Sequence, residues 1–269
     1  MENDTETVII EDDGPNSAIA YAPFDKAKEA LENKRYRIIS LEENARLRMQ
    51  QRKNYSVSQN GNWTREGVLN LPDKRIVLTR NSPIMINAKE ATSAHRNGNE
   101  YFLTQEQVEQ ALQDSVKLSG KDIPTNDFKN NEITNFAFGD VAESYGLFLK
   151  EAGIKEMPVY LANVSDKPFA RQIWFRGLDG RSELNCYSRS LGSGNEMRGV
   201  SEKTSEAGSQ NLEGILREVN VVCEKGSFNQ KVGLLQKLNK KIDYFVSREM
   251  YEEALRFQFE RDNLYKELR

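Results

Sequence analysis

The chain has 269 residues, a formal net charge of −3 at pH 7, 38% hydrophobic residues and 29% charged residues. This composition is too apolar for a wholly disordered protein and too polar for a membrane protein, and no stretch approaches the roughly 20 apolar residues of a membrane span. The negative net charge also excludes a general attraction to nucleic acid or to anionic membranes.

The N-terminal segment, residues 1–20, carries six acidic side chains and no basic one. We expect it to be a largely disordered tail, with one edge strand at residues 7–10. Its acidic start lacks the basic and then apolar plan of a signal peptide, which predicts a cytoplasmic protein. Cys186 and Cys223 are far apart in the sequence, so we expect both to remain thiols in that compartment.

Residues 21–204 are predicted to form an α+β globular domain with a mixed sheet and short helices. Ser40 with Glu43, and Thr104 with Gln107, have the spacing of capping boxes and predict two helix starts. The turn residues 72–75 lie between two apolar runs and predict a β-hairpin.

A strand, a helix and a second strand are expected in the middle of this domain. The apolar run Ile133–Phe138 predicts the first strand, and residues 159–162 predict the second. Between them, residues 141–152 have helical spacing, and Gly153 is placed to end that helix. This order is typical of a βαβ unit or of a split α/β sandwich.

The C-terminal region, residues 209–269, is predicted to be a helical module that follows a polar linker at 201–208. Apolar residues recur there at steps of three and four, which places them on single helix faces. One stripe contains Leu235, Leu238, Ile242 and Phe245, and the next contains Met250, Ala254, Phe257, Arg261, Leu264 and Leu268. The pattern predicts two amphipathic helices joined as a hairpin, with coiled-coil-like packing.

The sequence Tyr251-Glu252-Glu253-Ala254, followed by Arg261-Asp262 and Leu268, resembles the interaction motif of the UvrB/UvrC family. In this sequence Arg-Asp comes about three residues later than in that motif. The resemblance implies a helical hairpin that mediates contact between proteins, and the body resembles conserved prokaryotic proteins without implying an activity. The leading hypothesis is therefore a non-enzymatic adaptor that binds a protein partner or itself. The residues expected to carry that contact are Leu238, Ile242, Phe245, Phe257, Arg261 and Leu264.

A second hypothesis rests on residues 167–199, where six basic and three acidic residues alternate with aromatic ones. Arginine for phosphate and aromatic rings for stacking suit RNA or single-stranded nucleic acid. The residues expected to bind it are Arg171, Trp174, Arg176, Arg181 and Arg189. A plain amphipathic sheet with arginines at its rim is the structural alternative.

An enzyme of unknown class is the third hypothesis: it would use His95 or a carboxylate in a cleft between the hairpin at residues 68–79 and the βαβ unit, and no catalytic motif assigns the residue. His95 is the one histidine, which excludes sites with two histidines, and its place near a helix end suits a structural role. Gly192-Ser193-Gly194 lacks the remaining residues of a phosphate-binding loop and predicts a hairpin turn. No cofactor and no metal are expected.

Overall fold

The structure is a computed structural model, and the chain divides into two compact units, residues 1–204 and 205–269. The residues that it describes are 9–12, 17–51, 55–163, 165–179, 181–187, 190–201, 258 and 261. The second unit is thus described only at residues 258 and 261, both of which are helical. No helix among the described residues is long and apolar enough to cross a membrane.

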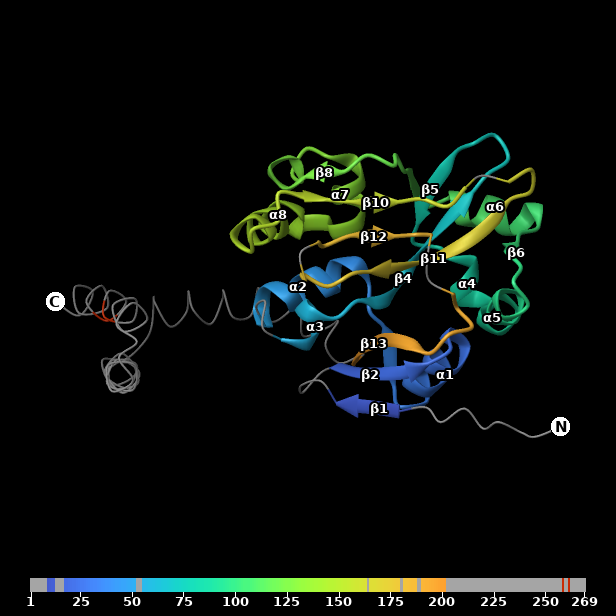
Figure 1. Ribbon diagram of the computed structural model, residues 1–269, viewed down its shortest axis with the longest axis horizontal. Coiled ribbons are helices and arrows are strands. Elements are labelled where there is room, and N and C mark those ends of the chain that lie inside the picture. Colours follow the sequence, from blue (N-terminus) through green and yellow to red (C-terminus); the bar gives the residue numbers. More distant parts are fainter. Residues whose placement is uncertain are drawn as a thin grey trace, which may run out of the picture. The chain divides into compact units, whose positions relative to one another are not determined.

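Within the described part of the first unit, eleven strands form one mixed sheet. Its main path runs β1-β2-β13-β4-β11-β12-β10, while β3 pairs with β13, β5 with β4 and β7, and β6 with β11 (Figure 1). Two further strands, β8 and β9, form a separate ribbon. The strands are β1 (Ile9–Asp12), β2 (Ser17–Ala22), β3 (Tyr36–Ile38), β4 (Asn62–Asn70), β5 (Ile76–Thr79), β6 (Tyr101–Phe102), β7 (Ser115–Lys117), β8 (Ile123–Pro124), β9 (Glu156–Met157), β10 (Val159–Tyr160), β11 (Phe169–Phe175), β12 (Leu184–Asn185) and β13 (Asn195–Ser201).

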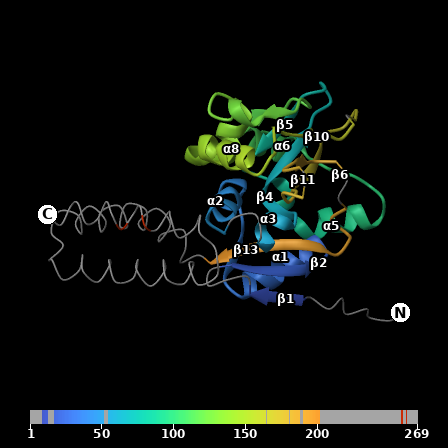
Figure 2. The same cartoon turned by 60° about the vertical axis from the view of Figure 1, so that its left-hand side comes forward.

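Helices lie at both ends of this sheet: α1 is beside β2 and β13, whereas α8 lies near β10 at the other end (Figure 2). The helices are α1 (Phe24–Asn33), α2 (Leu41–Gln51), α3 (Ser56–Gln59), α4 (Pro83–Ile86), α5 (Ala88–Arg96), α6 (Gln105–Leu112), η1 (Thr125–Asp127), α7 (Glu132–Phe138), η2 (Gly139–Val141) and α8 (Ala142–Glu151).

The sheet has a hydrophobic core on each face, because successive side chains of a strand point to opposite faces. On β11, Ile173 and Phe175 belong to the core that also contains α2, α7 and α8, while Ala170 and Trp174 belong to the core that contains α1, α5 and α6. The sheet is therefore a central layer, and helices cover it from both sides.

The last strand of the described sheet lies in its middle. β13 pairs antiparallel with β2, from Asn195 opposite Ala22 to Val200 opposite Ser17, and it pairs in parallel with β4 at Met197 and Trp63. These pairings join residues more than 130 positions apart, so the sheet cannot form until both ends of this unit have met.

Several local predictions are confirmed. Ser40 and Glu43 exchange hydrogen bonds at the start of α2, and Thr104 and Gln107 do so at the start of α6. The turn at residues 72–75 joins β4 to β5 as an antiparallel pair. Gly153 follows α8 with φ of 86°, in the left-handed region that suits glycine. The edge strand predicted at residues 7–10 lies at β1, Ile9–Asp12, and pairs with β2. β2 itself begins at Ser17, inside the segment expected to be a largely disordered tail, and its residues 17–20 are buried.

The predicted strand Ile133–Phe138 is wrong, because these residues form helix α7. The Asn131 side chain accepts hydrogen bonds from the backbone N–H groups of Ile133 and Thr134, at 3.0 and 3.3 Å, and so caps the helix. An apolar run of this length suits a buried helix as well as a strand. The βαβ unit that we expected around it is therefore absent from the described residues.

The predicted fold class, an α+β body that ends in a helical hairpin module, is also wrong. The described residues form one sheet-rich unit organised around long-range strand pairing, and they show neither a coiled coil nor a helical hairpin. Apolar periodicity reports a helix face, but it does not report which strands pair or which unit dominates the fold. The hairpin was predicted from residues 235–268, and within this range the structure describes only residues 258 and 261.

Candidate functional site: a polar pocket beside strand β10

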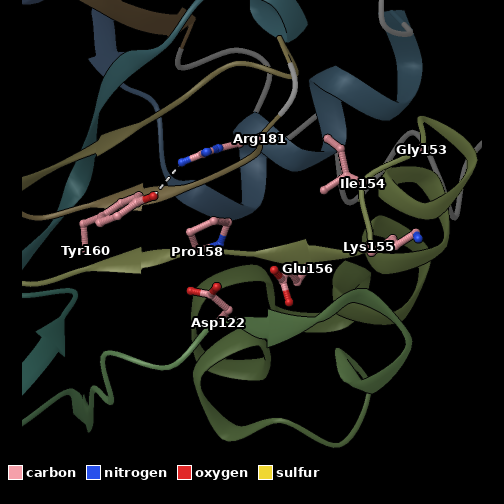
Figure 3. A pocket seen from close by; sticks show the side chains of 8 residues that line it. All are labelled: Asp122, Gly153, Ile154, Lys155, Glu156, Pro158, Tyr160 and Arg181. Carbon is pink, nitrogen blue, oxygen red and sulfur yellow. Dashed lines mark hydrogen bonds between the residues drawn. The ribbon is translucent and has the colours of Figure 1, made fainter.

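A polar pocket of about 330 Å³ lies where the β8–β9 ribbon meets strand β10 and the segment that precedes β12 (Figure 3). Its lining residues are Asp122, Gly153, Ile154, Lys155, Glu156, Pro158, Tyr160 and Arg181. Four of these eight residues are charged, so the pocket differs from the mostly apolar cavities that hold small apolar ligands.

Strand alternation explains one wall of the pocket. Glu156 of β9, Pro158 between the two strands and Tyr160 of β10 are alternate residues that line the cavity. Met157 and Val159 between them are buried in the core under the sheet. Tyr160 is 39% exposed. The core residues thus hold the backbone in place and turn the other three side chains toward the pocket.

Asp122 joins this wall from the neighbouring strand of the ribbon. Ile123 pairs with Met157 and Pro124 pairs with Glu156 in antiparallel register. Continuing this register by one residue places Asp122 opposite Pro158, on the same face as Glu156. Figure 3 shows both carboxylates on the same side of the pocket.

Arg181 and Tyr160 form the opposite end of the pocket. An Nη1 group of Arg181 donates a hydrogen bond of 2.9 Å to the phenolic oxygen of Tyr160 (Figure 3). The adjacent backbone is tethered, because the Leu184 N–H donates to the carbonyl of Pro158 and the Arg176 N–H donates to the carbonyl of Glu183. The arginine therefore projects from a fixed base.

A buried network anchors the residue next to Arg181. Ser182 is fully buried, and its hydroxyl lies 3.0 Å from the Tyr145 hydroxyl and 3.4 Å from Nη1 of Arg48. Arg48 is itself fully buried, donates to the carbonyl of Val57 at 2.9 Å and lies over the Phe175 ring at 4.0 Å. This network connects the pocket edge to α2, α3 and α8.

The charges that line the pocket have no ion-pair partner among the described residues. Asp122, Lys155, Glu156 and Arg181 take part in none of the salt bridges of that part of the chain, although salt bridges occur at many other places on the surface. In Figure 3 the Lys155 side chain points away from Arg181. Within the described residues, Arg181 and the two carboxylates thus line one pocket without forming an ion pair.

The structure brings two of the sequence candidates, His95 and Arg171, into a second cluster that is separate from the pocket lining. Arg171 forms an ion pair with Glu100 and donates to the carbonyl of Tyr187 at 2.9 Å. Burial and the charge of Arg171 lower the pKa of His95 to about 4, while Glu100 opposes this shift. The imidazole is therefore neutral at pH 7, and its buried Nε2 has no hydrogen-bond partner.

The other residues of the nucleic-acid hypothesis do not form one surface with Arg171. Trp174 is 6% exposed and packs edge-to-face on Trp63 at 5.2 Å, so it does not offer its ring to a base. Arg176 is exposed, and hydrogen bonding to Asp179, followed by the charges of Asp179 and Glu183, raises its pKa. Arg181 lines the pocket. Arg189 lies outside the described residues.

The predicted partner-binding residues of the C-terminal region are described at one position. Arg261 is helical and half-buried, while Leu238, Ile242, Phe245, Phe257 and Leu264 lie outside the described residues. The pocket, in contrast, contains Asp122, Glu156 and Tyr160, which sequence reasoning missed. A short alternating stretch with an exposed tyrosine was the available signal, but the partner strand was not recognisable from the sequence.

Comparisons with known proteins address the fold. No protein-family model matches the sequence, and no curated protein is significantly similar to it. Among solved structures, the chain is similar to one described as the accommodation of massive sequence variation in Nanoarchaeota by the C-type lectin fold. That match covers 74% of this chain and 99% of the other, with a TM-score of 0.54 and 14% sequence identity.

This chain has a C-type lectin fold. The finding replaces the predicted α+β body with a terminal hairpin, and it removes the coiled coil as the defining feature of the protein. In this C-type lectin fold the polar pocket lies at the end of the sheet where β10 is the outermost strand of the main path. The described residues contain no group of three or more His, Cys, Asp or Glu side chains placed to hold a metal ion.

Proposed function

We propose that this protein is a non-enzymatic recognition protein that binds a protein partner through the polar pocket of its C-type lectin fold. The observation that carries this proposal is the set of charged lining residues without ion-pair partners in the described chain. All four charged side chains are exposed, and they gather with Tyr160 around one cavity of about 330 Å³. A cavity that presents charges of both signs favours a charged ligand.

The fold neighbour supports this proposal in a second way. Its C-type lectin fold accommodates massive sequence variation, which requires a scaffold whose stability does not depend on its exposed side chains. In this chain Arg176, Asp179, Arg181 and Tyr187 are exposed, whereas their neighbours Phe175, Ser182 and Cys186 are buried. The same division between a recognition surface and a supporting core is expected here.

The experiment is a selection of random peptides on the immobilised full chain, in parallel with a Tyr160→Ala/Arg181→Ala variant. We expect the wild-type chain to enrich a family of peptides that the variant no longer binds. Arg75→Ala is the matched control, because Arg75 is an exposed arginine in the β4–β5 turn and does not line the pocket. It should retain full binding.

The absence of any enriched peptide family, or equal binding to wild type and pocket variant, would contradict the proposal. Enrichment that is lost in Arg75→Ala as well would indicate nonspecific attraction to surface charge. Circular dichroism and thermal unfolding of each variant ensure that lost binding does not reflect lost folding.

We also propose a cytoplasmic location for this recognition. Cys186 is a buried free thiol, and burial raises its pKa to about 12, so it stays protonated and unreactive. Fractionation of cells that produce the full chain tests the location, and recovery outside the cytoplasm would contradict it.

A further inference from the structure

We infer that the partner segment is an extended peptide with one basic and one acidic side chain, two or four residues apart. This inference rests on the proposed function and adds the chemistry of its ligand. It follows from the order of the charges along the pocket: Glu156 lies at one end, Asp122 lies beside the middle, and an arginine bound to a tyrosine hydroxyl lies at the other end.

The carboxylate end favours a cation. The ribbon register makes Asp122 and Glu156 diagonal neighbours on one face of β8 and β9, and such neighbours are about 7–8 Å apart or less. Two like charges at this separation repel each other, and neither has an ion-pair partner among the described residues. A lysine or arginine side chain between them would relieve this repulsion and form two ion pairs at once.

The arginine end favours a carboxylate. Arg181 uses an Nη1 N–H for the Tyr160 hydroxyl, which leaves most of its five N–H donors available. Because the phenol accepts that hydrogen bond, its own O–H is free to donate to the same ligand group. A carboxylate that accepts from the guanidinium and from the phenol would be held by charge-assisted bonds in a fixed geometry.

The length of the pocket wall sets the spacing within the peptide. Glu156 and Tyr160 are four residues apart on one extended stretch, which corresponds to about 13 Å at about 3.3 Å per residue. Asp122 stands opposite Pro158, in the middle of this length. A ligand cation thus lies about 7–13 Å from the carboxylate that Arg181 binds. In an extended peptide, side chains two or four positions apart lie on one face and are about 7 or 13 Å apart along the strand.

The peptide segment between the two charged residues would pass the buried residue Pro158, which stands opposite Asp122. The pocket offers this segment little apolar surface, because the Pro158 and Ile154 side chains are buried in the protein. A small residue there is expected to fit better than a large one in a cavity of about 330 Å³.

The test uses synthetic Gly/Ser peptides that carry one Lys and one Glu, one to six positions apart, in both orders. Binding to the isotopically labelled full chain is followed by NMR titration. We expect the tightest binding when the two residues are two or four positions apart, and a loss of at least about fivefold when either charged residue of the peptide becomes Gln. Since both contacts are exposed ion pairs, affinity should also fall as salt is raised.

Variants of the protein identify which end of the pocket binds the basic residue of the peptide and which binds the acidic one. Asp122→Asn/Glu156→Gln should remove the preference for Lys over Gln in the peptide and leave the preference for Glu intact. Arg181→Gln should do the reverse. This reciprocal pattern is the double-mutant signature of two separate contacts, and a variant that merely distorts the pocket would weaken both preferences together.

Two results separate the inference from the function beneath it. Peptides selected by the wild-type chain that depend on Tyr160 and Arg181, but carry no basic and acidic pair, would overturn the inference and leave the recognition function standing. If neither selected nor synthetic peptides bind in a pocket-dependent manner, both fail. Pocket-dependent binding of a neutral oligosaccharide in place of peptides would likewise overturn the inference.

Discussion

Two arginines of this protein, Arg48 and Arg181, lie on either side of Ser182 and have opposite surroundings. Arg48 is fully buried and donates to Val57, Tyr145, Ser182 and Phe175. Arg181 is exposed, and Tyr160 is the hydrogen-bond partner of its guanidinium. Burial and hydrogen-bond satisfaction, rather than residue type, therefore distinguish the supporting interior from the proposed recognition surface.

The same contrast applies to aromatic residues. Trp174 contacts Trp63 inside the sheet core, whereas Tyr160 stands partly exposed in the pocket. Trp174 belongs to β11 and Tyr160 to β10, so the two aromatic residues lie in the same sheet. Changes at the interior members should therefore alter stability, while changes at the pocket members should alter binding.

The largest expected effect is at Trp174. Trp174→Ala should lower the free energy of unfolding by about 3–5 kcal/mol, because it empties a large buried volume in the core. Urea denaturation measures this loss. Tyr160→Ala is the matched change in the pocket and should cost well under half as much, and equal losses for the two variants would remove the distinction between core and pocket aromatics.

Substitution of Arg48 is expected to cause the next largest loss of stability. Arg48→Leu places an apolar side chain at this buried position and leaves the carbonyls of Val57 and Phe175 without this donor. We therefore expect the free energy of unfolding to fall by about 2–4 kcal/mol. Arg181→Leu should stay within about 0.5 kcal/mol of the wild type. A stable Arg48→Leu variant would show that the buried network is dispensable for stability, as replacement of buried charges by apolar residues sometimes is.

Glu66 provides an interior carboxyl whose effect depends on pH. Burial, opposed by the charge of Arg65, raises its pKa to about 7, although Leu41 N–H donates to it at 2.9 Å. The folded chain therefore binds this proton more tightly than the unfolded chain does, so its contribution to stability is present below about pH 4.5 and is lost as pH rises to about 7. Relative to Glu66→Gln, the wild type should lose about 2–3 kcal/mol between pH 4.5 and pH 7.5 in urea denaturation. A constant difference between the two proteins would contradict the raised pKa.

His95 should give an effect of opposite sign, and a smaller one because its side chain is only partly buried and solvent screens its charge. Its folded pKa of about 4 lies below the usual 6.5, so the unfolded chain binds the proton first and stability falls as pH drops from about 6.5 to 4. Since the chain has one histidine, its NMR titration is assigned without ambiguity. A midpoint near 6.5 would mean that His95 is not shielded as the cluster with Arg171 and Glu100 indicates.

The predictions from sequence are confirmed where hydrogen bonds join groups only a few residues apart. The capping pairs at Ser40 and Thr104, the turn at 72–75 and the glycine at 153 each satisfy their own backbone groups locally. The prediction is wrong for Ile133–Phe138, where the deciding contact is the cap from Asn131, and an apolar run alone does not distinguish a helix from a strand.

Of the residues that line the candidate site, only Arg181 was predicted from the sequence to bind a ligand. Nothing in the sequence pairs residue 122 with the region of 156–160, because that register depends on the β8–β9 pairing across more than thirty residues. The tertiary structure also buried Trp174 and moved Arg171 to the cluster with Glu100 and His95. It thereby divided a patch that was continuous in the sequence.

The local helix starts, the turns and the absence of a strongly basic composition could be obtained from the sequence alone, since these depend on composition and on groups a few residues apart. The tertiary structure alone decided the C-type lectin fold, the central place of β13 and the pocket. These features arise from pairings between distant segments, and their free energy is gained only when the whole unit assembles.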